Sequence, residues 1–159
     1  MEDIRLMIGD VKFSARAVAV IQKKGKILFQ KRKNDEFWAL PGGAIATLER
    51  GKDVVTREIY EETGEKNSNV IRPLWFSEYF FSFDGKKQHQ YILGYLVDVP
   101  NNSKLLEKNE FYGIEKEKNI IYKWIDIKDL NNSPIKPEFL KEKLSLINET
   151  FEFIEEDNL

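Results

Sequence analysis

An Asp-Gly pair at residues 84–85 separates two long strand-like segments of the chain. The first, VIRPLWFSEYFFSF, covers Val70–Phe83, and the second, QHQYILGYLVDV, covers Gln88–Val99. Both are rich in the aromatic and β-branched residues that favour strands, and Asp-Gly is a typical hairpin turn. We therefore predict two long antiparallel strands, which commit the fold to a sheet with an antiparallel core.

Other segments alternate between strand-like and helix-like patterns. FSARAVAVIQ (Phe13–Gln22) and ILFQKRK (Ile27–Lys33) flank the turn KKGK and predict a second hairpin, and IIYKWIDI (Ile120–Ile127) predicts a further strand. Apolar residues at helical spacing predict a helix over Lys136–Ile154, and the remaining EEDNL is expected to fray. Strands interrupted by helices indicate an α/β fold, a mixed and largely antiparallel sheet covered by helices.

Size and composition limit the class of protein. The chain has 159 residues without a break in composition, which predicts a single domain over residues 1–159. It has no cysteine, which excludes disulfides, thiolate metal sites and cysteine nucleophiles. The net charge of −2 argues against nucleic acid or an anionic membrane as the main partner. Because neither a leader-like start nor a membrane-length apolar run is present, we expect a cytoplasmic protein.

The segment Lys52–Thr63 has the composition of a helix, and Gly64 follows it where a C-cap is expected. Glu58, Glu61 and Glu62 are spaced so that they share one helix face. Like charges at this spacing repel, and those near the C-terminus also face the negative end of the helix dipole. Either the glutamates form a solvated acidic face or they bind a hard cation such as Mg²⁺ or Mn²⁺. The helix alone does not decide between these two interpretations.

The wider spacing favours the metal site. Glycine, glutamate and arginine positions around the helix follow a fixed order: Gly43, five residues, Glu49, seven residues, Arg57-Glu58, Ile59, one residue, Glu61-Glu62, one residue, Gly64. Preceded by WALPGG, this order resembles the signature of the Nudix hydrolases, with YKWIDIKDL resembling a later strand and turn of that family. One position departs from it: Glu65 stands where the family prefers a bulky aliphatic residue, so we expect a local effect on stability there.

The resemblance to this MutT-like family implies an α/β/α sandwich and a reaction class. It implies hydrolysis, with Mg²⁺ or Mn²⁺ as cofactor, of the pyrophosphate in a nucleoside diphosphate linked to another group X. This fits the charges, because a cluster of glutamates repels a pyrophosphate unless divalent ions lie between them. Two alternatives stay open: a non-catalytic nucleotide-binding or sensing domain, and an RNA 5′-end pyrophosphohydrolase. The identity of X is not determined, and exposed strand edges allow a homodimer.

The same resemblance implies roles for individual residues. The catalytic and metal-binding carboxylates are expected to be Glu58, Glu61 and Glu62. A backbone carbonyl at Gly42 is expected to join them, while Glu49 and Arg57 brace the loop against the helix.

Further candidates lie outside this segment. For a metal ligand on the loop before Trp124 we prefer Glu117 over Glu115, although EKEKN has equally the composition of a solvated loop. Candidates for substrate contact are Arg32, Phe80 and Phe81, with a solvated strand end or core packing as the alternative.

Overall fold

The computed structural model describes all residues from Met1 to Leu159. Its centre is the long strand β2 (Val11–Lys23), which pairs in parallel with β6 (Lys86–Asp98). Strand β6 in turn pairs antiparallel with β5 (Asn69–Phe83), so the predicted long hairpin is confirmed. Its turn places Asp84 and Gly85 at φ 52° and 74°, the left-handed backbone that an Asp-Gly hairpin turn requires.

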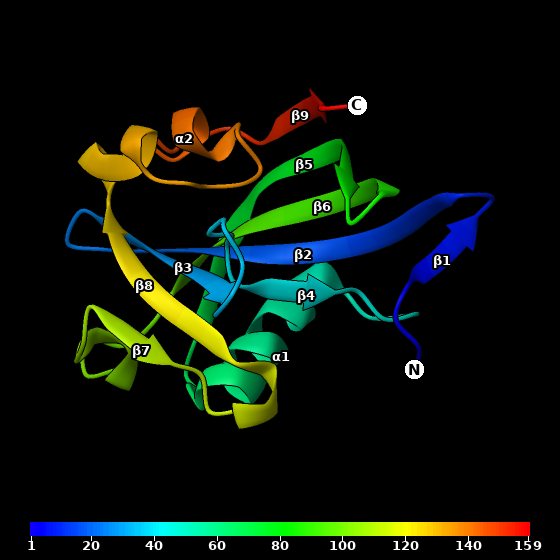
Figure 1. Cartoon of the computed structure of the whole chain (residues 1–159). Coiled ribbons are helices and arrows are strands. Elements are labelled where there is room, and N and C mark those ends of the chain that lie inside the picture. The colour runs from blue at the N-terminus through cyan, green and yellow to red at the C-terminus, as the bar shows by residue number, and fades with distance from the viewer.

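The second predicted hairpin exists but opens after its turn. Strand β3 (Lys26–Arg32) pairs with β2 at only two positions, and then pairs along its whole length with β8 (Ile120–Asp126). Strand β7 (Glu110–Tyr112) extends this part of the sheet beyond β8. Because β2 and β3 diverge, the sheet splays into two parts that share the β2–β3 turn (Figure 1).

Three short strands complete the sheet. Strands β1 (Arg5–Ile8) and β4 (Gly42–Ala44) pair antiparallel with β2, and β9 (Glu152–Asp157) pairs in parallel with β5. Only the β2–β6 and β5–β9 pairs are parallel, so the sheet is mixed and largely antiparallel as predicted.

Helices lie on both faces of the sheet. Helix α1 (Gly51–Thr63) packs Val54, Val55 and Ile59 on one face and ends at Gly64, whose φ of 83° confirms the predicted C-cap. The opposite face is covered by the 3₁₀ helix η3 (Ile127–Asn132) and the single-turn helix α2 (Leu140–Lys143) (Figure 1). Two more 3₁₀ turns, η1 (Lys104–Leu106) and η2 (Lys116–Lys118), lie in the connection to β8. No helix is both long and apolar enough to span a bilayer.

The helix predicted over Lys136–Ile154 is wrong in its extent, and so is the frayed end. Only Leu140–Lys143 is α-helical, although two of the apolar residues at helical spacing, Leu140 and Leu144, are fully buried. The following segment instead forms β9 along the free edge of β5, where Ile154 enters the core. The segment forms a strand because the edge of β5 presents unpaired backbone N–H and C=O groups, with which a strand forms hydrogen bonds and an isolated helix end does not.

Candidate active site

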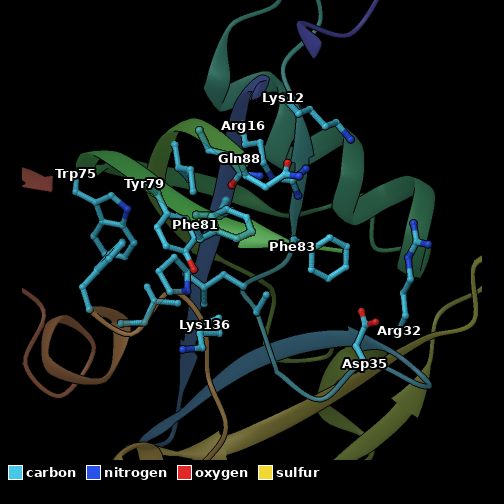
Figure 2. Close-up of a pocket in the computed structure, with 18 residues that line it drawn as sticks. Lys12, Arg16, Arg32, Asp35, Trp75, Tyr79, Phe81, Phe83, Gln88 and Lys136 are labelled. Atoms are coloured by element: carbon cyan, nitrogen blue, oxygen red, sulfur yellow. The ribbon is translucent and has the colours of Figure 1, made fainter. Parts of the chain in front are cut away.

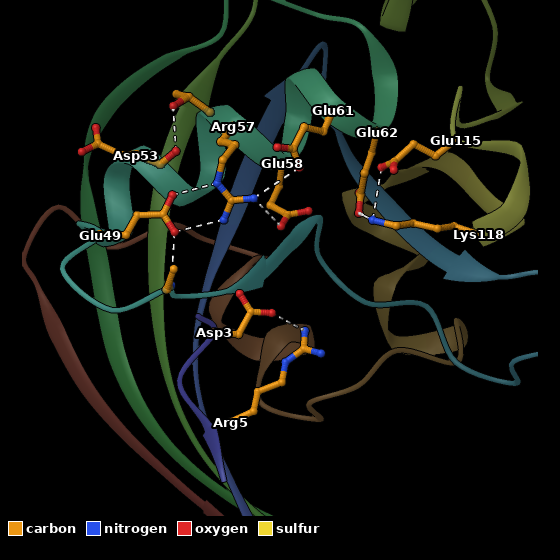
Figure 3. Close-up of polar contacts among 12 residues, drawn as sticks. Asp3, Arg5, Glu49, Asp53, Arg57, Glu58, Glu61, Glu62, Glu115 and Lys118 are labelled. Atoms are coloured by element: carbon orange, nitrogen blue, oxygen red, sulfur yellow. Dashed lines mark hydrogen bonds and ion pairs between the residues drawn. The ribbon is translucent and has the colours of Figure 1, made fainter. Parts of the chain in front are cut away.

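A forked ion pair fixes the loop between β4 and α1 to the helix. Arg57 donates from Nε to Glu49 Oε2 at 2.7 Å and from Nη2 to Glu49 Oε1 at 3.0 Å. Glu49 Oε1 also accepts a hydrogen bond from the backbone N–H of Ala46 at 3.2 Å. The guanidinium of Arg57 lowers the pKa of Glu49, so this carboxylate stays charged (Figure 3). Both partners were predicted to brace this loop, and the structure places them in direct contact.

Two consecutive glycines bring β4 close to its neighbours. Gly42 and Gly43 lie opposite Val18 and Ala17 of β2. A Cβ on Gly42 would clash with the carbonyl oxygen of Ala17, and a Cβ on Gly43 would clash with the carboxylate of Glu58. The glycines therefore let the β4 backbone approach both the central strand and the first glutamate of α1.

The third glutamate of the cluster is buried. Glu62 Oε2 accepts a 2.6 Å hydrogen bond from the hydroxyl of Tyr122, and Lys118 Nζ lies 3.9 Å from Glu62 Oε1. Burial, together with the negative charge of Glu58, raises the pKa of Glu62 to about 7, while the Tyr122 hydrogen bond lowers it. The site thus carries closely spaced negative charge in a poorly solvated place.

Two protein cations contact the glutamates in this structure. Arg57 Nη1 donates to Glu58 at 3.0 Å and to the exposed Glu61 at 3.3 Å, and Lys118 approaches Glu62 (Figure 3). Because each cation also pairs with a further carboxylate, the cluster keeps an excess of negative charge. No three acidic or histidine side chains gather around one point that could hold a metal ion. The donors themselves fit Mg²⁺ or Mn²⁺, because they are carboxylate oxygens on one helix face beside a glycine strand that leaves room for Glu58.

The loop before β8 reaches the cluster through a residue other than the preferred one. Glu117 is exposed, and its side chain makes no hydrogen bond or ion pair with the glutamates of α1. Glu115 instead pairs with Lys118 at 3.2 Å, and Lys118 in turn approaches Glu62. Of the two loop candidates, the structure therefore brings Glu115 and not Glu117 to the site.

A pocket of about 470 Å³ opens between β2, β5, β6 and the segment before α2 (Figure 2). None of the α1 glutamates lines it, but its lining residue Arg16 is within electrostatic range of Glu58 and Glu62. Its apolar wall is aromatic and includes Tyr79 and Phe81, whose rings stack with centroids 4.4 Å apart. Alternation along β5 places Phe81 in the pocket and Phe80 on the opposite face, against His89. Phe80 is therefore not a pocket residue, contrary to the prediction, whereas Phe81 and Arg32 both line it.

Three pocket cations were missed by sequence reasoning. Lys12 and Arg16, four residues apart on β2, line the pocket together with Lys136. The available signal was the arginine itself, a charged residue within the otherwise apolar SARAVAVI. Its significance depends on which face of the strand is covered, and that is a property of the assembled sheet.

Comparison with known proteins identifies the family. The model of the NUDIX domain matches residues 11–143, which is most of the chain. The chain belongs to the NUDIX family. The fold agrees, since a MutT NUDIX hydrolase from Burkholderia pseudomallei superposes with a TM-score of 0.60 at 24% identity, covering 86% of this chain and 98% of that one.

Curated NUDIX relatives align over shorter stretches. An RNA pyrophosphohydrolase from Actinobacillus pleuropneumoniae serotype 5b is 33% identical over 66 residues, which is 42% of this chain and 32% of that protein. An ADP-ribose pyrophosphatase from Methanocaldococcus jannaschii is 50% identical over 48 residues, 28% of each chain. The alignments thus span about a third or less of these two relatives.

Proposed function

We propose that this NUDIX protein is a metal-dependent pyrophosphohydrolase that cleaves a nucleoside diphosphate linked to another group. The observation that carries the proposal is a pocket with an aromatic wall and several cations, one of which, Arg16, is within electrostatic range of the α1 glutamates Glu58 and Glu62. The glutamates suit pyrophosphate chemistry only together with a cation, and the aromatic wall suits a nucleobase. The names of the curated relatives, both pyrophosphate-cleaving enzymes, support the same reaction class.

Glu58, Glu61 and Glu62 are the proposed ligands of Mg²⁺ or Mn²⁺, with a backbone carbonyl of Gly42 as a further candidate. A divalent ion bound there supplies charge neutralisation of the phosphate oxygens and activation of water for attack on phosphorus. Glu61 is the least encumbered of the three, because it is exposed and its one side-chain contact is the 3.3 Å bond from Arg57. Glu115 is the proposed metal-binding carboxylate from outside the helix, because it pairs with Lys118, which in turn approaches Glu62.

The remaining residues hold the substrate and the loop. Phe81 offers a ring face to a nucleobase, and Arg32 lies at the rim of the same pocket as a cation for phosphate (Figure 2). The Glu49–Arg57 pair fixes the loop between β4 and α1, so its role is to position Glu58 and Glu61 through Arg57 Nη1.

The test is a substrate panel with product identification. Purified protein with Mg²⁺ or Mn²⁺ is offered nucleoside triphosphates, sugar nucleotides, dinucleotides and ADP-ribose, and the phosphate-containing products are identified. We expect cleavage at a pyrophosphate bond, and a loss of at least about 100-fold in kcat for Glu61→Gln. Glu149→Gln, an exposed glutamate without side-chain contacts, is the matched control. Metal binding without turnover of any compound would refute the enzyme and leave a nucleotide-binding domain.

A second candidate substrate comes from the comparisons. Because the A. pleuropneumoniae relative is an RNA pyrophosphohydrolase, a 5′-triphosphorylated oligonucleotide belongs in the panel. The net charge of −2 gives no general attraction to an RNA backbone, so we expect a mononucleotide derivative to be the better substrate. A higher kcat/KM for the oligonucleotide would reverse this order.

A further inference from the structure

Arg16 carries a guanidinium that has no acceptor within the protein. It lies on β2 opposite Ala44 of β4 and Ile92 of β6, and it is half-buried in the wall of the pocket. A guanidinium has five N–H groups, yet Arg16 makes no side-chain hydrogen bond and no ion pair in the described chain. Arg57, by contrast, is bonded to three carboxylates.

Arg16 is poorly explained as a counter-ion for the glutamates. Burial lowers the pKa of Arg16 below its usual range, and the positive charge of Arg5 lowers it further. The charges of Glu58, Glu62 and Asp3 raise it by less. Neither glutamate comes within ion-pair distance of it, because Glu58 pairs with Arg57 and Glu62 with Lys118. Holding an unpaired charge in a partly desolvated place is unfavourable, and an oxyanion entering the pocket would satisfy it.

Its place in the pocket shows which anion it can meet. Arg16 shares the pocket with the aromatic wall that includes Phe81 (Figure 2). It is also within electrostatic range of Glu58 and Glu62. A nucleotide whose base lies on the aromatic wall and whose scissile bond lies at the glutamates must pass its phosphate chain between the two. Arg16 lines the pocket and is within electrostatic range of both glutamates, so it is suited to meet this phosphate chain.

We propose that Arg16 is a phosphate-binding residue, which anchors the phosphate chain of the substrate between the glutamates of α1 and the aromatic wall. This inference rests on the proposed function for the kind of ligand. A guanidinium binds two phosphate oxygens in parallel, a geometry that an ammonium does not reproduce. Arg16 therefore determines affinity for the diphosphate part of the ligand and contributes little to recognition of the base.

Binding of non-hydrolysable ligands tests the inference apart from turnover. The α,β-methylene analogues of ADP, GDP, CDP and UDP, and base-free methylenediphosphonate, are titrated calorimetrically in Mg²⁺ into the wild type, Arg16→Gln and Arg16→Lys. Lys86→Gln removes one exposed positive charge outside the pocket and is the matched control. The melting temperature of each variant is measured alongside.

We expect Arg16→Gln to weaken the Kd of the best analogue at least about tenfold, Arg16→Lys to lose about threefold or more, and the control to bind as the wild type does. Should Arg16→Gln not fold, Arg16→Lys decides. Wild-type affinity in the folded variants, or no binding of any analogue by the wild type, would overturn the inference. Arg16-dependent binding without turnover in the substrate panel would instead refute only the proposed hydrolase.

Discussion

The hydroxyl of Tyr122 donates a 2.6 Å hydrogen bond to Glu62, joining strand β8 to the helix that carries the glutamate cluster. Tyr122 is only 1% exposed and its ring stacks on Phe111, so the hydroxyl cannot be replaced by water without a rearrangement. This bond fixes one oxygen of Glu62 and leaves the other toward Lys118.

Tyr122→Phe should therefore destabilise the fold while leaving its shape unchanged. Loss of a buried hydrogen bond to a charged group predicts a decrease of about 1.5–3 kcal/mol in the free energy of unfolding at pH 8, where Glu62 is mostly ionised. Urea unfolding measures it. Tyr112→Phe is the control, because Tyr112 is 60% exposed and its hydroxyl has no partner in the chain. Equal stability of the two variants would contradict the assigned role of the bond.

The Glu49–Arg57 pair predicts a pH-dependent contribution to stability. Because Arg57 lowers the pKa of folded Glu49, the stabilisation is fully present above the ordinary glutamate pKa and is lost as the pH falls through the lowered folded value. Arg57 keeps 35% of its side chain exposed, so solvent screening limits the effect, and Glu49→Gln should cost about 1–2 kcal/mol at pH 7.

Unfolding of wild type and Glu49→Gln between pH 7 and pH 3 measures this difference. We expect the two stabilities to converge at the acid end of the range. A difference that is independent of pH would show that the variant acts through packing and not through the charge of Glu49.

The two glycines of β4 predict opposite outcomes for the same substitution. In Gly42→Ala the new methyl group meets the backbone carbonyl of Ala17, which cannot move without shifting β2, so we expect a loss of about 2–3 kcal/mol in stability. In Gly43→Ala it meets the carboxylate of Glu58, which can swing away. Gly43→Ala should stay folded and lose activity. Melting temperatures and kcat values of both variants measure this contrast. If the Gly43→Ala variant kept the wild-type kcat, the proposed role of Glu58 in the site would be refuted.

Phe81 and Phe80 form a second matched pair, adjacent in sequence and on opposite faces of β5. If Phe81 stacks on a nucleobase, Phe81→Ala loses about 1–3 kcal/mol of binding, which raises KM about fivefold to 100-fold or more. Phe80→Ala removes packing against His89 and should leave KM unchanged. Steady-state kinetics on the best substrate of the panel compare the KM values of the two variants. Equal KM values would refute a role of the aromatic wall in substrate recognition.

Local patterns in the sequence were enough to predict the main helices and strands and the helix face that carries the three glutamates. The long hairpin, strand β8, helix α1 and its glycine cap all follow from residue types and spacings within a few positions of each other. The same holds for Glu58, Glu61 and Glu62, because three residues at i, i+3 and i+4 share a face in any helix. The spacing from Gly43 to Gly64 around these glutamates added the family, which the domain match confirms.

Only the tertiary structure decided which distant residues complete the site. Tyr122 and Glu62 are 60 positions apart, and their contact depends on how β8 packs against α1. Which faces are covered likewise decides three other features of the site. These are the position of Glu115 rather than Glu117 near Glu62, the packing of Phe80 on the face opposite the pocket, and the unpaired guanidinium of Arg16. The C-terminal segment gives the same lesson, since its apolar spacing indicated a helix but the free edge of β5 made it a strand. Spacing along the chain determines which side chains share a face, whereas packing between elements determines what that face meets.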